Sequence, residues 1–165
     1  MSVALVRVDD RLLHGQVLLG WGCALDAVRY IIVDDALADS AFERALVESC
    51  GGDCPVEIVN AAAGAALVVA ERAREGAAIV LVRGLTQALD LVRAVRAVGG
   101  AIDIVNLGGM HHATGKERVH DFVYLDAADR AALGELASLG VRVRVQDVPA
   151  ATPFLAPAAW AARVA

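Results

Sequence analysis

The chain has 165 residues, a length typical of one domain, and we expect residues 1–165 to form a single domain. Hydrophobic residues make up 58% of it and charged residues 21%, a composition that excludes disorder. Fifteen Lys and Arg against twenty Asp and Glu give a net charge of −5, which argues against non-specific binding to nucleic acid or anionic membranes.

Cysteine usage and the first residues indicate an intracellular protein. Three irregularly spaced cysteines are too few for a secreted disulfide framework, so we expect reduced thiols. The first apolar run meets Arg7 before the core of a signal peptide can form. The sequence therefore predicts a cytoplasmic location.

Short β-branched runs alternate along the chain with longer segments rich in alanine and leucine. The runs predict seven strands, at Val3–Val8, Arg29–Val33, Val56–Val59, Ala78–Val82, Ile102–Val105, Phe122–Leu125 and Val141–Val145. The segments between the first five predict four helices, at Gln16–Leu25, Ala38–Ser49, Ala61–Arg74 and Thr86–Val98. Thr86 is the expected N-cap of the fourth helix, and Gly99–Gly100 would end it.

This alternation breaks after the fifth strand. Residues 106–121 contain three glycines and no helical period, which predicts a long loop and permits one late strand to run antiparallel. A helix follows at Ala127–Leu139, with Asp126 as N-cap and Gly140 at its end, and a final helix should begin near Thr152–Pro153. The predicted fold is α/β: one open, doubly wound, mainly parallel seven-stranded sheet with helices on both faces.

In such sheets ligands bind beyond the carboxyl ends of the strands. Three predicted loops lie there, namely Asp9–His14, Asp34–Asp35 and Asn106–Lys116. The first loop concentrates charge: two carboxylates, Arg11 and His14 follow a buried strand and precede a helix. Folding alone requires only a turn and a cap at this position, so this loop is the candidate site.

The residues around His14 suit a phosphohistidine. The positive end of a helix disfavours an imidazolium, but free backbone N–H groups at Gly15, Gln16 and Val17 would cradle phosphate oxygens. Arg11 can offer donors to the phosphoryl group, and Asp9 or Asp10 can hold one ring N–H so that the other nitrogen keeps its lone pair. The competing interpretation is a capping histidine beside a solvated cluster of charges.

Residues 6–17, VRVDDRLLHGQV, resemble the active-site signature of the mannose/fructose/sorbose-type IIB components of the bacterial phosphoenolpyruvate-dependent sugar phosphotransferase system. The resemblance covers nearly the whole chain. Supporting matches are residues 31–38, residues 105–110 with Gly115 and Lys116, and a C-terminal part from Val123 to Pro149. The first match is highly specific.

The resemblance implies that His14 accepts a phosphoryl group on Nδ1 from a IIA domain and passes it to a sugar bound in a membrane IIC/IID permease. Arg11 matches the arginine that helps to hold the phosphate, and no metal or other cofactor is needed because the donor is itself a phosphohistidine. We expect peripheral association with the permease. The expected rim of the site comprises Arg7, Asp34, Asn106, Gly108, Gly109 and Lys116.

Other site types fit the sequence less well. The first strand–helix loop lacks the glycines of a dinucleotide fingerprint, and the glycine loop misses the Walker A spacing and its Ser or Thr. The histidines at positions 111, 112 and 120 lack acidic or Cys partners at zinc-like spacing. Trp21 and Trp160 are expected to be packing residues. A regulatory phosphohistidine relay without a permease is the alternative function, and a homo-oligomer is left open.

Overall fold

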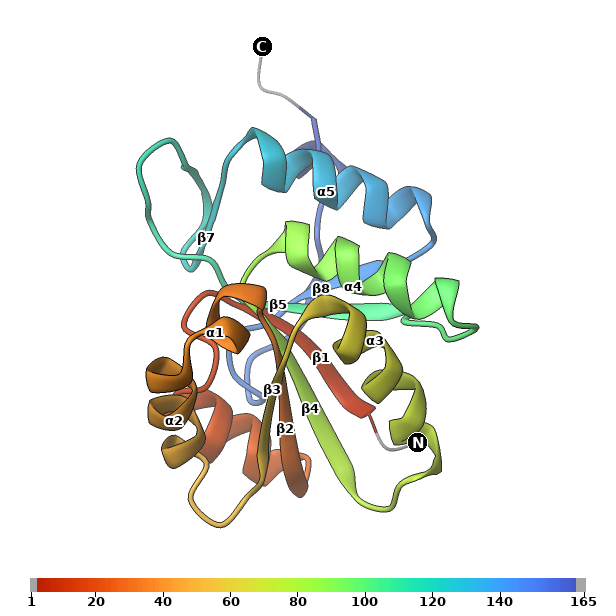
Figure 1. The fold of residues 1–165 in the computed structure, drawn as a ribbon. Helices are drawn as coiled ribbons and strands as arrows, with labels where there is room; N and C mark the ends of the chain where they lie inside the picture. Colours follow the sequence, from red (N-terminus) through yellow and green to blue (C-terminus); the bar gives the residue numbers. More distant parts are fainter. Residues whose placement is uncertain (1–2, 163–165) are drawn as a thin grey trace.

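The computed structural model describes residues 3–162 and contains a mainly parallel seven-stranded sheet (Figure 1). The strand order is β3-β2-β4-β1-β5-β8-β9, and only the edge pair of β8 and β9 is antiparallel. The strands are β1 (Val3–Asp9), β2 (Ala27–Val33), β3 (Val56–Val59), β4 (Ala77–Val82), β5 (Ile104–Gly109), β8 (Arg142–Val145) and β9 (Phe154–Leu155). The predicted fold class is confirmed, including one late antiparallel strand.

Helices cover both faces of this sheet. One face carries α3 (Ala61–Ala70), α4 (Leu85–Ala97) and α5 (Ala127–Ser138); the other carries η1 (Gln16–Gly22, a π-helical segment), α1 (Asp35–Asp39) and α2 (Ala41–Cys50). Successive residues of β4 point to opposite faces of the sheet. Val80 and Val82 belong to the core on the side of α3 and α4, whereas Ile79 and Leu81 belong to the core on the side of η1. Within residues 3–162 no helix is both long and apolar enough to cross a bilayer.

Two late elements differ from the prediction. The run Phe122–Leu125 belongs to an antiparallel hairpin of β6 (Glu117–His120) and β7 (Val123–Leu125), outside the main sheet. The seventh strand is instead β9, at the position where a final helix was expected. Pro153 and Pro157 flank β9, and a helix through this segment would lose a backbone N–H at Pro157. Between β9 and residue 162, the described chain contains a short 3₁₀ turn, η3 (Ala158–Trp160).

Both ends of α5 were predicted correctly, but other helix ends differ from the prediction. Asp126 caps α5 by accepting the N–H of Asp129, and Gly140 follows with a φ of +76°. Thr86 is not a cap, because α4 already begins at Leu85, after the extended Gly84. The expected helix Ala38–Ser49 is broken at Ser40, which is extended and caps α2. The expected helix Ala61–Arg74 ends at Ala70 and continues as 3₁₀ helix η2 (Glu71–Ala73).

The order of the strands determines the position of the site. β1 is a central strand, between β4 and β5, so the segments that follow these three strands meet at one edge of the sheet. β5 extends to Gly109, and β6 occupies part of the predicted loop 106–121. The loop between β5 and β6 is therefore shorter than predicted, and it lies beside the loop after β1.

Candidate functional site

His14 is held by the carboxylate at the end of β1. Its Nε2 lies 3.0 Å from Oδ2 of Asp9, which is fully buried, whereas the His14 side chain is 17% exposed. A carboxylate only accepts hydrogen bonds, so in a neutral His14 ring this contact places the proton on Nε2 and the lone pair on Nδ1. Of the two carboxylates considered from the sequence, Asp9 contacts His14, and it does so through Nε2 rather than Nδ1.

Asp9 is in turn fixed by Arg7, two residues earlier on β1. Nη2 and Nε of Arg7 donate to Oδ2 of Asp9, at 2.8 and 3.2 Å. The third nitrogen, Nη1, donates to Oδ1 of Asn106 at 2.7 Å and to the backbone carbonyl of Gln146 at 3.2 Å. Burial lowers the pKa of Arg7, and the Asp9 carboxylate opposes this shift. Arg7 and Asn106 were expected at the rim, but both are buried, because these bonds satisfy the guanidinium and permit its burial.

Gly108 provides the space that the Arg7 guanidinium occupies. A Cβ at this position would lie 1.8 Å from Cζ of Arg7. Gly108 was expected at the rim, but it is a buried residue of β5, so its glycine is explained by packing. Gly109 lies closer to the site: its carbonyl accepts the N–H of Asp10 at 3.1 Å, and a Cβ there would lie 3.7 Å from the Asp9 carboxylate.

The backbone of the loop turns sharply before His14. Leu12 has a φ of +53°, unusual for a residue with a side chain, and its N–H donates to the carbonyl of Asp9. Val17 was expected to offer a free N–H, but it donates to the carbonyl of His14 at 2.9 Å, because the helix has already begun. The N–H groups of Gly15 and Gln16 have no hydrogen-bond acceptor within the described residues.

Arg11 lies at the surface of this loop. Its side chain is 46% exposed, and its Nη2 donates to Oε1 of Gln16 at 2.8 Å, while its Nε is 3.8 Å from Oδ1 of Asp9. The backbone N–H of Arg11 also donates to the same Asp9 oxygen, at 3.2 Å. The guanidinium is therefore held near His14 by the exposed Gln16 and the buried Asp9, and its other donors remain accessible.

Asp10 connects two loops. Its carboxylate accepts the backbone N–H of His111 at 2.6 Å and lies 2.7 Å from His111 Nδ1. It therefore fastens the segment after β5 to the loop after β1, rather than holding the ring of His14.

Sequence reasoning missed Arg83, the residue that directly follows β4. Its Nε lies 2.7 Å from Oδ2 of Asp34, a buried carboxylate that also caps α1, and its Nη1 is 3.5 Å from the carbonyl of Asp10. Asp34, expected at the rim, thus faces Arg83. The signal was present in the sequence, because an arginine after a buried strand lies at the same edge as the other loops.

The remaining candidates lie in separate contacts. Lys116, expected at the rim, contacts Asp129 at 2.5 Å and Asp126 at 3.8 Å at the start of α5, where the two carboxylates hold it. The ring of His112 packs edge-on against Tyr124, and His120 lies among Phe122, Phe154 and Trp160. Among the described residues, no group of three or more His, Cys, Asp and Glu side chains is arranged to hold a metal ion.

Comparison with known proteins agrees with this geometry. The family model of the PTS system sorbose subfamily IIB component matches residues 3–156. The sorbose-specific EIIB component of Lacticaseibacillus casei is 32% identical over 149 residues, 90% of this chain and 88% of the relative. The mannose-specific EIIAB component of Escherichia coli K12 is 30% identical over 148 residues, which cover 90% of this chain and 45% of that protein.

A solved structure extends the likeness to three dimensions. The IIB domain of the sorbose permease from Klebsiella pneumoniae superposes with a TM-score of 0.81 at 29% identity, covering 93% of both chains. The family model spans nearly the whole sequence, and it includes the loop in which Asp9 holds His14. The chain therefore belongs to the sorbose subfamily of IIB components of the phosphotransferase system, the family that the residues around His14 resemble.

Proposed function

We propose that His14 carries a phosphoryl group on Nδ1, between a IIA domain and a sugar. One observation carries the proposal: Asp9 binds Nε2 of His14 and leaves the Nδ1 lone pair free. That lone pair attacks phosphorus, and a P–N bond forms at His14 as the P–N bond of the donor phosphohistidine breaks. In the second step a sugar hydroxyl attacks, so that a P–O bond forms, the P–N bond to His14 breaks and the hydroxyl proton is released.

Arg11 and Arg83 are proposed to compensate the charge that the phosphoryl group brings. Both side chains are about half exposed, 46% and 48%, and both belong to segments that meet at the carboxyl edge of the sheet. Charge on the transferring group lies on its equatorial oxygens, where such donors act. The N–H groups of Gly15 and Gln16 are further candidate donors.

The partners follow from the chemistry. We propose the IIA domain as donor and a sugar held by a IIC/IID permease as acceptor, with this chain on the cytoplasmic side of that permease. The relative named EIIAB supports the first pairing, since its name joins an A and a B part in one protein. Both partners must approach the same Nδ1 in line, so they should bind the same face in turn, through small and transient contacts.

The test is phosphorylation in a reconstituted system. Wild-type protein, incubated with phosphoenolpyruvate, the general phosphotransferase proteins and a cognate IIA, should gain one acid-labile phosphoryl group, and ¹⁵N NMR should place it on Nδ1. His14→Ala should abolish labelling. His112→Ala removes a ring that packs on Tyr124 instead, so it should be labelled like the wild type. Labelling that survives in His14→Ala, or a phosphate on Nε2, contradicts the proposal.

A second experiment examines the shared face. Adding the IIA domain to ¹⁵N-labelled protein should shift the amide signals of residues 10–16 and of His111, and detergent-solubilised permease should compete with it. Shifts confined to the region of Trp160 would contradict a single docking face.

A further inference from the structure

β1 is paired with both neighbouring strands only near its C-terminal end. Its register with β4 runs from Val3 to Val8, whereas its register with β5 covers only Arg7 to Asp9. Towards their N-terminal ends β1 and β5 diverge, and a groove of about 530 Å³ lies between them. Residues 3–6 of β1 therefore have no cross-strand partner on β5, although β1 is a central strand of the sheet.

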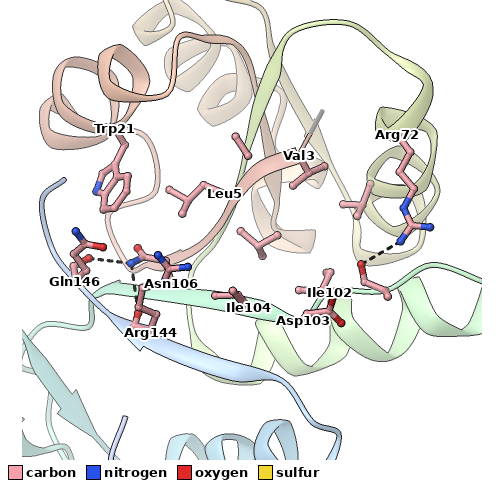
Figure 2. A pocket seen from close by; sticks show the side chains of 14 residues that line it. Val3, Leu5, Trp21, Arg72, Ile102, Asp103, Ile104, Asn106, Arg144 and Gln146 are labelled. Carbon is pink, nitrogen blue, oxygen red and sulfur yellow. Dashed lines mark hydrogen bonds between the residues drawn. The ribbon is translucent and has the colours of Figure 1, made fainter. Parts of the chain in front are cut away.

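The groove has an apolar floor and polar ends (Figure 2). Val3 and Leu5 of β1 border one side and Ile104 borders the other; Trp21, Asn106 and Gln146 lie at one end, and Arg72 lies at the opposite end. Arg144 of β8 also lines it. Asn106 and Gln146 are the same residues whose oxygens accept hydrogen bonds from Arg7, so this end of the groove touches the support beneath Asp9.

The arginines around this groove lack carboxylate partners. Within residues 3–162, the cations with no carboxylate oxygen within 4.0 Å are Arg72, Arg96, Arg142 and Arg144. Arg72 and Arg144 line the groove, and Arg142 lies two residues from Arg144 on β8, on the same face. Asp103 is the one acidic side chain among the lining residues. The groove is therefore locally positive in a chain of net charge −5.

We propose that this groove binds an extended acidic segment of a partner protein. The partner would pair its backbone with residues 3–6 of β1, as peptides do when they add a strand to an open edge. Its apolar side chains would cover Leu5 and Ile104, and its carboxylates would meet Arg72 and Arg144.

The dimensions and charge of the groove support this occupant. Four extended residues span about 13 Å, the length of the unpaired stretch of β1. A volume of 530 Å³ falls inside the range of roughly 300–1,000 Å³ typical of ligand sites. Arginines at both ends of an apolar floor require carboxylates at two places along the ligand, which a peptide provides and a compact anion does not.

The test uses a defined probe on the full chain. The hexapeptide acetyl-Glu-Val-Glu-Val-Glu-Val-amide is titrated into ¹⁵N-labelled protein, and amide and indole shifts are followed. The expected shifts lie at residues 3–6, at residues 102–104 and at the Trp21 indole N–H. Arg72→Gln and Arg144→Gln should each weaken binding about tenfold, because each removes one charge-assisted hydrogen bond. The same peptide with Gln in place of Glu should bind at least tenfold more weakly.

Arg96→Gln is the matched control, because Arg96 also lacks a carboxylate partner but lies on α4 and is not among the residues that line the groove. It should bind like the wild type. Several outcomes overturn the proposal: no shifts in the groove, equal binding of the neutral peptide, or shifts only around His14. Weaker peptide binding in Arg144→Gln but not in Arg72→Gln would indicate a site for a compact anion instead of an extended peptide. Groove shifts that depend on protein concentration without peptide would indicate a second copy of this chain.

Discussion

Charged side chains are paired at the C-terminal end of β1, whereas the arginines beside its N-terminal end have no carboxylate partners. In the C-terminal half, Arg7 and Asp9 are fully buried, and both are paired with each other and with neighbouring groups. Beside the N-terminal half, Arg72 and Arg144 border an open groove and have no carboxylate partner among the described residues. The same strand thus supports an internally neutral cluster at one end and an unneutralised surface at the other.

The paired charges at one end position His14, whereas the unpaired charges at the other end are available to bind a ligand. A buried pair with satisfied hydrogen bonds has one geometry, which suits the support of His14. A solvent-accessible cation without a carboxylate partner contributes little to folding and remains available to an incoming ligand. Removing a charge at the C-terminal end should therefore lower the free energy of unfolding, whereas removing a charge beside the N-terminal end should weaken binding of the acidic peptide.

The largest effect is expected from Arg7→Met. It leaves the Asp9 carboxylate buried without its cation, and breaking a buried pair in this way costs about 3–5 kcal/mol of unfolding free energy. Arg144→Met is the control at the other end and should change stability by less than about 0.5 kcal/mol. Urea unfolding monitored by circular dichroism measures both. Equal losses of unfolding free energy in the two variants would contradict the expected difference between the paired and the unpaired arginines.

Next in size is the effect of Arg11→Ala on phosphoryl transfer. Loss of one preorganised donor should raise the transfer barrier by about 2–4 kcal/mol, while stability changes by about 0–1 kcal/mol, since the side chain is 46% exposed. Rapid-quench measurement of transfer from the IIA domain tests this. Arg44→Ala, which removes an exposed ion pair on α2, serves as control. A wild-type transfer rate with a much lower melting temperature would make Arg11 structural.

Gly108→Ala tests the packing of the paired half. The added methyl would overlap the Arg7 guanidinium, and overpacking of this kind costs about 1–3 kcal/mol. At Gly20, by contrast, a Cβ would meet only Pro149 at an ordinary 3.6 Å, so Gly20→Ala should be neutral or stabilising. Thermal unfolding compares the two. If Gly108→Ala is as stable as Gly20→Ala, the guanidinium has room to move and is not rigidly held.

The smallest expected effect on stability comes from Asp126, the N-cap of α5, which lies outside β1. The backbone N–H of Asp129 lowers the pKa of Asp126 below its ordinary value of 3.8, and Lys116 acts in the same direction. Because the folded-state pKa is depressed, this carboxylate stabilises the protein above pH 3.8, and the contribution is lost as pH falls through the folded value. Asp126→Ala should cost about 1 kcal/mol at pH 6.

The stability difference between wild type and Asp126→Ala should shrink towards pH 2, in unfolding curves recorded over this range. A constant difference would assign the effect to packing rather than charge.

The sequence predicted the alternation of strands and helices and the loop around His14, because hydrophobic period and residue type are local signals. It did not predict the burial of Arg7. That burial depends on Asn106 and Gln146, which lie far away in the sequence and reach Arg7 only through the pairing of β1, β5 and β8. Gly108 was misplaced for the same reason, since only the folded sheet shows what lies against it.

Arg83 could have been found. Strand order decides which loops are neighbours, and β4 lies beside β1 although a long stretch of sequence separates them. The sequence places Arg83 at the carboxyl edge of the sheet because it follows a buried strand, but local patterns do not give strand order, so its position beside the β1 loop was not predictable. In contrast, β9 was missed because a two-residue strand between prolines has no periodicity to detect.

The internal neutralisation of Arg7 has a consequence for the energetics of a carrier. Because Arg7 is bonded to Asp9, its charge is not offered to the phosphoryl oxygens, and the proposed ionic contacts to the cargo come from two arginines that water partly screens. A fully buried cation against the phosphate would deepen the energy minimum of the loaded state and slow its discharge. Under the proposed function, the loaded histidine therefore keeps a high group-transfer potential, and unloading to an acceptor remains downhill.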